Sequence, residues 1–95
     1  MAERVTTTFW MDFSIADAFG KSAIQDTFDR AFAGWKNNYK YLTELVMVLN
    51  HKCWQWHEKN DTYCALYSDL YYKARDYAYD NLQGDELNFF YSVTD

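Results

Sequence analysis

Both histidines and both cysteines of the chain lie in one short stretch, where metal or thiol chemistry is conceivable. They are His51, Cys53, His57 and Cys64. Zinc takes thiolate and imidazole ligands from paired, closely spaced motifs, and this stretch contains neither Cys-x-x-Cys nor His-x-x-x-His. We therefore predict no metal ion and no cofactor. The two thiols are expected to be reduced and packed as small apolar groups.

Nucleophilic catalysis is the second chemistry that this stretch suggests. Cys64 and His57 could act as a thiol and its base, but such a pair needs a third group that orients the base, and none stands at a recognisable spacing. The glycines at positions 20, 34 and 84 are isolated, so no glycine-rich loop is available to hold a phosphate. We predict a protein that is not an enzyme and assign no catalytic residue. A hydrolase or metal enzyme centred on His57 is the alternative.

Basic and aromatic side chains alternate between residues 30 and 41. Aromatic rings stack on nucleobases, and ammonium or guanidinium groups pair with phosphates. A small anionic nucleotide ligand is therefore one candidate partner, and a sponge for a nucleotide-derived immune signal is one alternative function. Equally, Trp35 could be a core residue at a helix end with lysines extended past it. The candidate ligand-binding residues are Arg30, Trp35, Lys36, Tyr39 and Lys40.

Tyrosines recur every fourth residue from Tyr63 to Tyr71, which places them on one face of a helix. Tyrosine offers a large contact area at a low entropic cost, so this face suits an interface; a half-buried helix flank explains it equally well. The helix expected over residues 39–59 is apolar around more than half of its circumference. This pattern predicts a central helix or one that another subunit covers. The candidate interface residues are Met47, Trp54, Tyr63, Tyr67 and Tyr71.

Three acidic residues in the same region, Asp69, Asp76 and Asp80, share an outer helix face. Such a row could imitate a phosphate backbone, and an acidic nucleic-acid mimic that inhibits a host nuclease is a further alternative function. A solvated face explains the row as well.

The composition limits the fold and the partners. The chain has 95 residues, 49% of them hydrophobic and 21% aromatic, which excludes a disordered tail. It has no proline and only three glycines, which disfavours an all-β fold. The net charge of −5 argues against direct nucleic-acid binding, which depends on basic side chains. No apolar run approaches the roughly 20 residues of a membrane span, and no apolar leader segment opens the chain. We expect a cytoplasmic protein that does not contact a membrane.

Apolar residues that recur every three or four positions predict three main helices. The first is expected to begin with a cap at Ser22, the second at Tyr39, and the third near Thr62 with Asp61 or Thr62 as its cap. They are expected to end near Asn37, Lys59 and Leu82. A short helical turn over 14–20 precedes them and a short helix over 85–90 follows. Residues 1–13 are a candidate extended arm, because they are rich in β-branched and aromatic side chains. The sequence thus predicts a single all-α domain over residues 1–95, a small bundle of three main helices with short helical segments at both ends.

Twenty aromatic side chains exceed what a bundle of this size is expected to hide. A chain of this length buries about two thirds of its unfolded surface, and contiguous exposed aromatic surface usually marks an interface. We therefore expect a homo-oligomer.

Several segments of the chain carry a resemblance to a known family. They are residues 10–17 with Phe19 and Gly20, residues 23–28 in part, residues 39–50, residues 81–84, and Thr94 with Asp95. Over these segments the chain resembles a family of short helical proteins of unknown function that bacteriophages and prophages encode. The resemblance implies an accessory protein in the bacterial host cytoplasm and gives no catalytic residues. The predicted function is a non-enzymatic binding protein that recognises a host component, a host protein or a small anionic ligand, in an anti-defence role.

Overall fold

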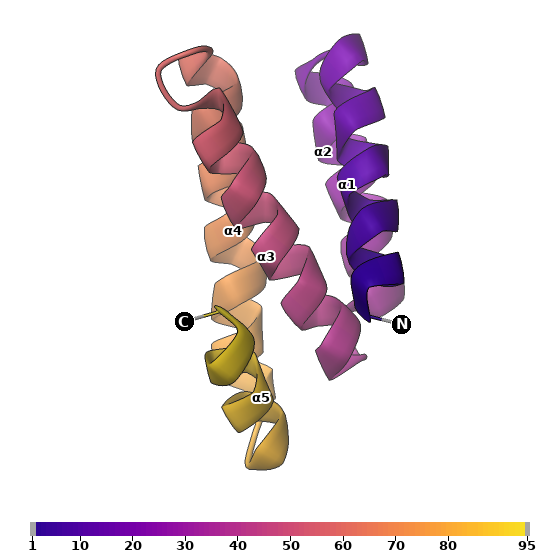
Figure 1. Cartoon of the computed structure of the whole chain (residues 1–95), viewed down its shortest axis with the longest axis vertical. Coiled ribbons are helices and arrows are strands. Elements are labelled where there is room, and N and C mark those ends of the chain that lie inside the picture. The colour runs from indigo at the N-terminus through magenta and orange to yellow at the C-terminus, as the bar shows by residue number, and fades with distance from the viewer. Residues whose placement is uncertain (1, 95) are drawn as a thin grey trace.

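Five α-helices follow one another along the chain (Figure 1). The computed structural model describes the backbone of residues 2–94 and the side chains of residues 9–94, and this part contains no strand. The predicted all-α class is confirmed. The helices are α1 (Ala2–Phe19), α2 (Lys21–Trp35), α3 (Tyr39–Trp56), α4 (Asp61–Asn81) and α5 (Asp85–Thr94).

The first helix corrects the expected N-terminal arm. Residues 2–13 are helical and continue into the segment that was expected to be a single short turn, so α1 is as long as α3. The reason is burial: Phe9, Phe13 and Ala16 recur by four and three positions, and all three are buried in the core. This packing outweighs the weak helix propensity of the threonines at the start of the segment.

Gly20 makes the tight reversal between α1 and α2. Its φ of 114° and ψ of −177° lie in a region that only glycine adopts readily, so the expected helix end at Gly20 is confirmed. The next helix begins immediately at Lys21 without a side-chain cap, so the expected cap at Ser22 is wrong.

Asparagines cap the next two helices. The side-chain oxygen of Asn38 accepts from the backbone N–H groups of Lys40 and Tyr41 at 3.2 Å, and that of Asn60 accepts from Tyr63 at 3.0 Å. These bonds satisfy donors that the first helical turn leaves free. Both breaks lie where the sequence predicts them, although the cap of α4 is Asn60 rather than Asp61 or Thr62.

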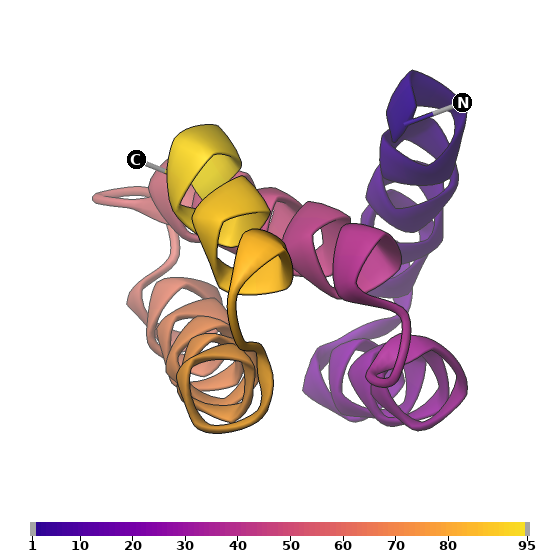
Figure 2. The same cartoon turned by 90° about the horizontal axis from the view of Figure 1, so that it is seen from below.

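The third helix is the centre of the fold. It packs against all four other helices, and Figure 2 shows it lying between the α1–α2 pair on one side and α4 with α5 on the other. Four residues of its predicted apolar stripe, Leu42, Leu45, Val46 and Leu49, are completely buried, and Cys53 and Trp56 at the end of the stripe are half-buried. Val48, which lies off this stripe, is completely buried as well, which agrees with the prediction of a centrally placed helix.

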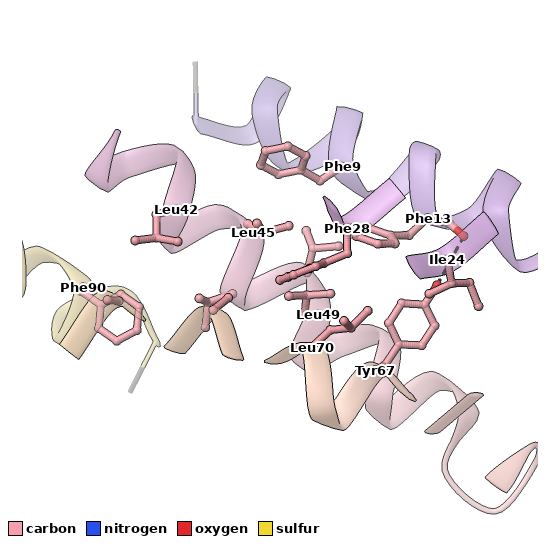
Figure 3. Close-up of a cluster of buried hydrophobic side chains, with 14 of the residues drawn as sticks. Phe9, Phe13, Ile24, Phe28, Leu42, Leu45, Leu49, Tyr67, Leu70 and Phe90 are labelled. Carbon is pink, nitrogen blue, oxygen red and sulfur yellow. Dashed lines mark hydrogen bonds between the residues drawn. The ribbon is translucent and has the colours of Figure 1, made fainter. Parts of the chain in front are cut away.

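The core joins α1 to α4 across this central helix (Figure 3). The ring of Phe13 meets the ring of Tyr67 edge-on at 5.7 Å, and the Tyr67 hydroxyl donates to the Phe13 carbonyl at 3.4 Å. Ile24 and Phe28 enter the same cluster from α2, and Phe90 enters it from α5. Each of these fully buried side chains contributes roughly 1.5–3 kcal/mol of hydrophobic stabilisation.

In the part of the chain that the structure describes, no helix combines the length and the apolar character that a bilayer crossing requires.

Candidate functional site

The outer face of α1, formed by Met11, Ile15 and Phe19, is apolar and exposed. Their exposed fractions are 55%, 58% and 79%. They recur every four residues, on the side of α1 opposite the buried Phe9 and Phe13. A helix that is apolar on two opposite sides needs a partner on each. The core supplies one partner, and the second side has none within the described residues.

A groove between α1 and α2 continues this outer face. Its cavity volume is about 490 Å³, within the range typical of binding pockets. Ile15, Phe19 and Ala23 line it near the turn, and Asp12 and Arg30 are among its polar lining residues. The outer face and its groove therefore combine an apolar ridge with charges of both signs.

The charge of the chain is unequally distributed around this surface. Residues 1–40 contain five basic and five acidic side chains, whereas residues 41–95 contain four and nine. Counted by helix, α1 has three acidic side chains and one basic side chain, the same net balance as α4, whereas α2 is neutral and α3 has one excess positive charge.

A second exposed surface, the tyrosine–arginine patch, consists of Tyr72, Arg75 and Tyr79 on α4 and Tyr91 on α5. The Arg75 guanidinium lies 4.6 Å from the Tyr72 ring centroid and 5.4 Å from that of Tyr79, and Tyr79 lies 5.9 Å from Tyr91. Desolvation opposes the charge of Arg75, but contacts with Tyr71 and its neighbours outweigh it and raise the pKa. The guanidinium is therefore a fixed cation among exposed rings, a composition that is typical of interface hot spots.

The five predicted ligand-binding residues do not converge in the cavities described for this chain. Arg30 and Trp35 share a cavity of about 200 Å³, which is smaller than typical ligand pockets. The Lys36 ammonium instead lies over the rings of Phe32 and Tyr77, and that of Lys40 lies over Tyr39.

The reason for this separation is the turn between α2 and α3. Trp35 and Lys36 end one helix, while Tyr39 and Lys40 begin the next. Trp35 is exposed and meets Tyr41 edge-on at 4.3 Å, so it is not the buried core residue that the alternative interpretation expects.

The five predicted interface residues also separate. Trp54 is 65% exposed, whereas Met47 is half-buried and lines a cavity with Tyr71. Tyr63 is half-buried, and Tyr67 is completely buried, so it cannot form the predicted contact. The fourfold spacing does place these tyrosines along one side of α4, but Tyr63 and Tyr67 point toward α1. Burial and the hydrogen bond to Asp17 raise the pKa of Tyr67 above its ordinary value.

The polar centre of the fold is the Asp17 network, which sequence reasoning missed. The Lys52 ammonium, completely buried, donates to Asp17 Oδ2 at 2.7 Å. The same carboxylate accepts from Tyr67 Oη at 2.5 Å and from Trp56 Nε1 at 3.3 Å, and the Asp17 carbonyl accepts from Tyr63 Oη at 2.9 Å. The network therefore fixes α1 to α3 and α4. Each group of the network holds another in place.

The histidine and cysteine stretch forms no metal centre among the described residues. His57 is exposed, with its ring against Trp54 at 5.2 Å. The thiol of Cys64 faces that of Cys53 at 3.6 Å. No bond between Cys64 and His57 appears among the hydrogen bonds of the described residues, so the geometry does not supply a thiol–base pair.

The acidic row lies open on α4, with Asp69, Asp76 and Asp80 all exposed. Asp76 Oδ1 lies 3.6 Å from the Arg75 guanidinium, so one of the three carboxylates is partly balanced.

Comparison of the chain with protein-family models, with curated proteins and with solved structures finds no match. The exposed surfaces of the chain are therefore the features that bear on its function. The outer face of α1 was detectable in the sequence, because its three residues and the buried Phe9, Phe13 and Ala16 form two stripes of helical spacing in one segment.

Proposed function

We propose that the protein is a non-enzymatic binding protein that self-associates through the outer face of α1 and contacts a host protein through the tyrosine–arginine patch. The observation that carries the proposal is the apolar character of α1 on two opposite sides. Exposed aromatic surface supports it as well, because three of the four tryptophans, Trp10, Trp35 and Trp54, are exposed in the single chain.

A second copy of the chain is the best occupant of the outer face of α1. The ridge of Met11, Ile15 and Phe19 is continuous with a groove of apolar and mixed-charge lining, so the same surface offers both a projection and a depression. A twofold axis would let each copy use both, as isologous interfaces do.

Ile15→Glu is expected to convert a dimer to a monomer, because it places a charge at the centre of the apolar ridge. We expect the dissociation constant to rise at least about tenfold. Sedimentation equilibrium at tens of micromolar measures the change. An association free energy of about 8 kcal/mol corresponds to a dissociation constant of about 1 μM, so a dimer of this strength or weaker is partly dissociated in this concentration range.

The matched control is Trp54→Glu, which charges an equally exposed apolar position on α3. It should leave the dimer intact. A monomeric wild-type protein would refute self-association. A dimer that Trp54→Glu breaks and Ile15→Glu preserves would move the interface to the Met47–Trp54 side of α3.

The host protein is the proposed partner of the tyrosine–arginine patch. Tyrosine and arginine dominate interface hot spots, and the two helices that carry the patch, α4 and α5, lie on the other side of α3 from α1 in Figure 2. The resemblance to phage-encoded proteins supports a partner in the bacterial cytoplasm and an anti-defence role.

Tyr72→Ser should abolish capture of this partner from a bacterial lysate, because it removes one ring of the cage around Arg75. Quantitative mass spectrometry of the captured proteins measures the loss. The control is the double variant Asp69→Asn/Asp80→Asn, which neutralises exposed carboxylates that flank the patch on α4 and keeps its rings and Arg75. Capture that survives the first change and fails with the second would identify a nucleic-acid mimic instead.

A further inference from the structure

Two thiols from different helices lie against each other near the tip where α3 passes into α4. Cys53 Sγ lies 3.6 Å from Cys64 Sγ and 3.6 Å from the Cys64 carbonyl oxygen. Both cysteines are free and half-buried. A disulfide has a sulfur–sulfur distance of about 2.0 Å, so the two sulfurs have to approach by about 1.6 Å to form the bond.

We propose that Cys53 and Cys64 form a reversible oxidation site that closes to an intramolecular disulfide when a low-molecular-weight disulfide, such as oxidised glutathione, is the oxidant. The dithiol is the form expected in a reducing cytoplasm. The disulfide joins α3 to α4 and holds the tip between them. This site is independent of both proposed binding surfaces.

The reaction takes place in two exchange steps that balance. The Cys64 thiolate attacks one sulfur of oxidised glutathione, which forms a Cys64–glutathione bond, breaks the glutathione disulfide and releases one glutathione thiolate. The Cys53 thiolate then attacks the Cys64 sulfur, which forms the Cys53–Cys64 bond and releases the second glutathione. The two thiol protons pass to the two departing thiolates. The protein loses two electrons, and the oxidant gains them.

The surroundings of the two sulfurs assign the order of these steps. Burial raises the pKa of Cys53 to about 11, and its contact with Cys64 acts in the same direction. Near neutral pH only a very small fraction of Cys53 is thiolate, so this thiol is a slow first nucleophile. It is well placed for the second step, because the Cys64 sulfur is its immediate neighbour and the attack is intramolecular.

The chain length between the two cysteines determines what closure does to stability. They stand 11 positions apart, so the disulfide restricts a short loop of the unfolded chain. Such a restriction is expected to raise the melting temperature by about 10 °C.

The test uses the full chain in glutathione buffer with equal concentrations of the reduced and oxidised forms. After acid quenching and alkylation, intact-mass spectrometry should show that most of the wild-type protein has lost two hydrogen atoms and carries no alkyl group. Dithiothreitol should restore the dithiol. The Cys53→Ser and Cys64→Ser variants should show no such loss, and Cys64→Ser should acquire glutathione more slowly than Cys53→Ser.

Three outcomes would overturn the proposal. They are a wild-type protein that stays a dithiol in this buffer, one that carries glutathione on separate thiols, and one whose disulfide joins two chains. Because the mass measurement is made on the wild-type protein, a poorly folded variant does not affect the result.

Discussion

Replacing Asp17 by alanine is expected to lower the free energy of unfolding by about 3–5 kcal/mol. The change removes the only carboxylate that forms an ion pair with Lys52 in the described part of the chain. Lys52 is completely buried, so its charge would remain in the interior without an opposite charge. Such an uncompensated buried charge is among the most destabilising defects that one substitution can produce.

The remaining contacts of Lys52 cannot compensate for the loss of the Asp17 carboxylate, because none of these partners carries a negative charge. Its ammonium also donates to Ser14 Oγ at 3.0 Å and to Gln55 Oε1 at 3.1 Å, and it lies 4.4 Å from the Trp10 ring centroid. These partners solvate the cation but do not neutralise it. The Tyr67 hydroxyl would lose its short hydrogen bond to Asp17 at the same time and keep only the longer one to the Phe13 carbonyl at 3.4 Å.

Urea unfolding followed by circular dichroism measures the effect, and two further variants separate its causes. Asp17→Asn keeps the shape and loses the charge, so it should be nearly as destabilising. The double variant Asp17→Leu/Lys52→Met removes both charges and should recover much of the loss, since apolar replacements of buried ion pairs are often neutral. A change below about 1 kcal/mol for Asp17→Ala would show that water reaches Lys52.

The Asp17 network also determines where the proposed interface lies. Asp17 is on the same helix as Met11, Ile15 and Phe19, and its partners Lys52 and Tyr67 hold that helix against α3 and α4. The inward contacts of Asp17, together with the buried Phe9, Phe13 and Ala16, therefore set the face that α1 presents outward. A loosened α1 should weaken self-association as well, without any change in the outer face.

Local signals in the sequence were sufficient to locate three of the helices. The breaks before α3 and α4 contain Asn38 and Asn60, whose side chains cap the following helix regardless of the rest of the fold. Apolar spacing likewise identifies the stripe of α3. These features depend on residues within about one helical turn of each other, which is the range over which capping and periodicity act.

Contacts between distant residues could not be derived in this way. Lys52 and Asp17 are 35 positions apart, and neither has a neighbour in sequence that indicates an ion pair. Periodicity shows that Tyr63 and Tyr67 share a face, but not that the face points toward α1. The exposed rings instead belong to Tyr72, Tyr79 and Tyr91, which no single repeat connects because they come from two helices.

Phe13→Ala is expected to destabilise the protein by about 3–5 kcal/mol, the usual cost of removing a buried phenyl ring and leaving a cavity. Phe13 tests the largest difference between the sequence-based prediction and the structure. In an extended arm its ring would be largely exposed, so its removal would cost little stability. In the folded chain it is completely buried and packs edge-on against Tyr67. Urea unfolding of the variant measures the loss.

Ile15→Ala is the matched comparison on the same helix, two residues away and 58% exposed. Under conditions where the protein is monomeric, it should change the free energy of unfolding by no more than about 0.5 kcal/mol, because its side chain touches solvent rather than the core. At higher concentration, where the dimer forms, Ile15→Ala should weaken self-association while leaving each subunit folded. Equal effects of the two substitutions on unfolding would contradict the orientation of α1, and with it the assignment of its outer face to a second copy.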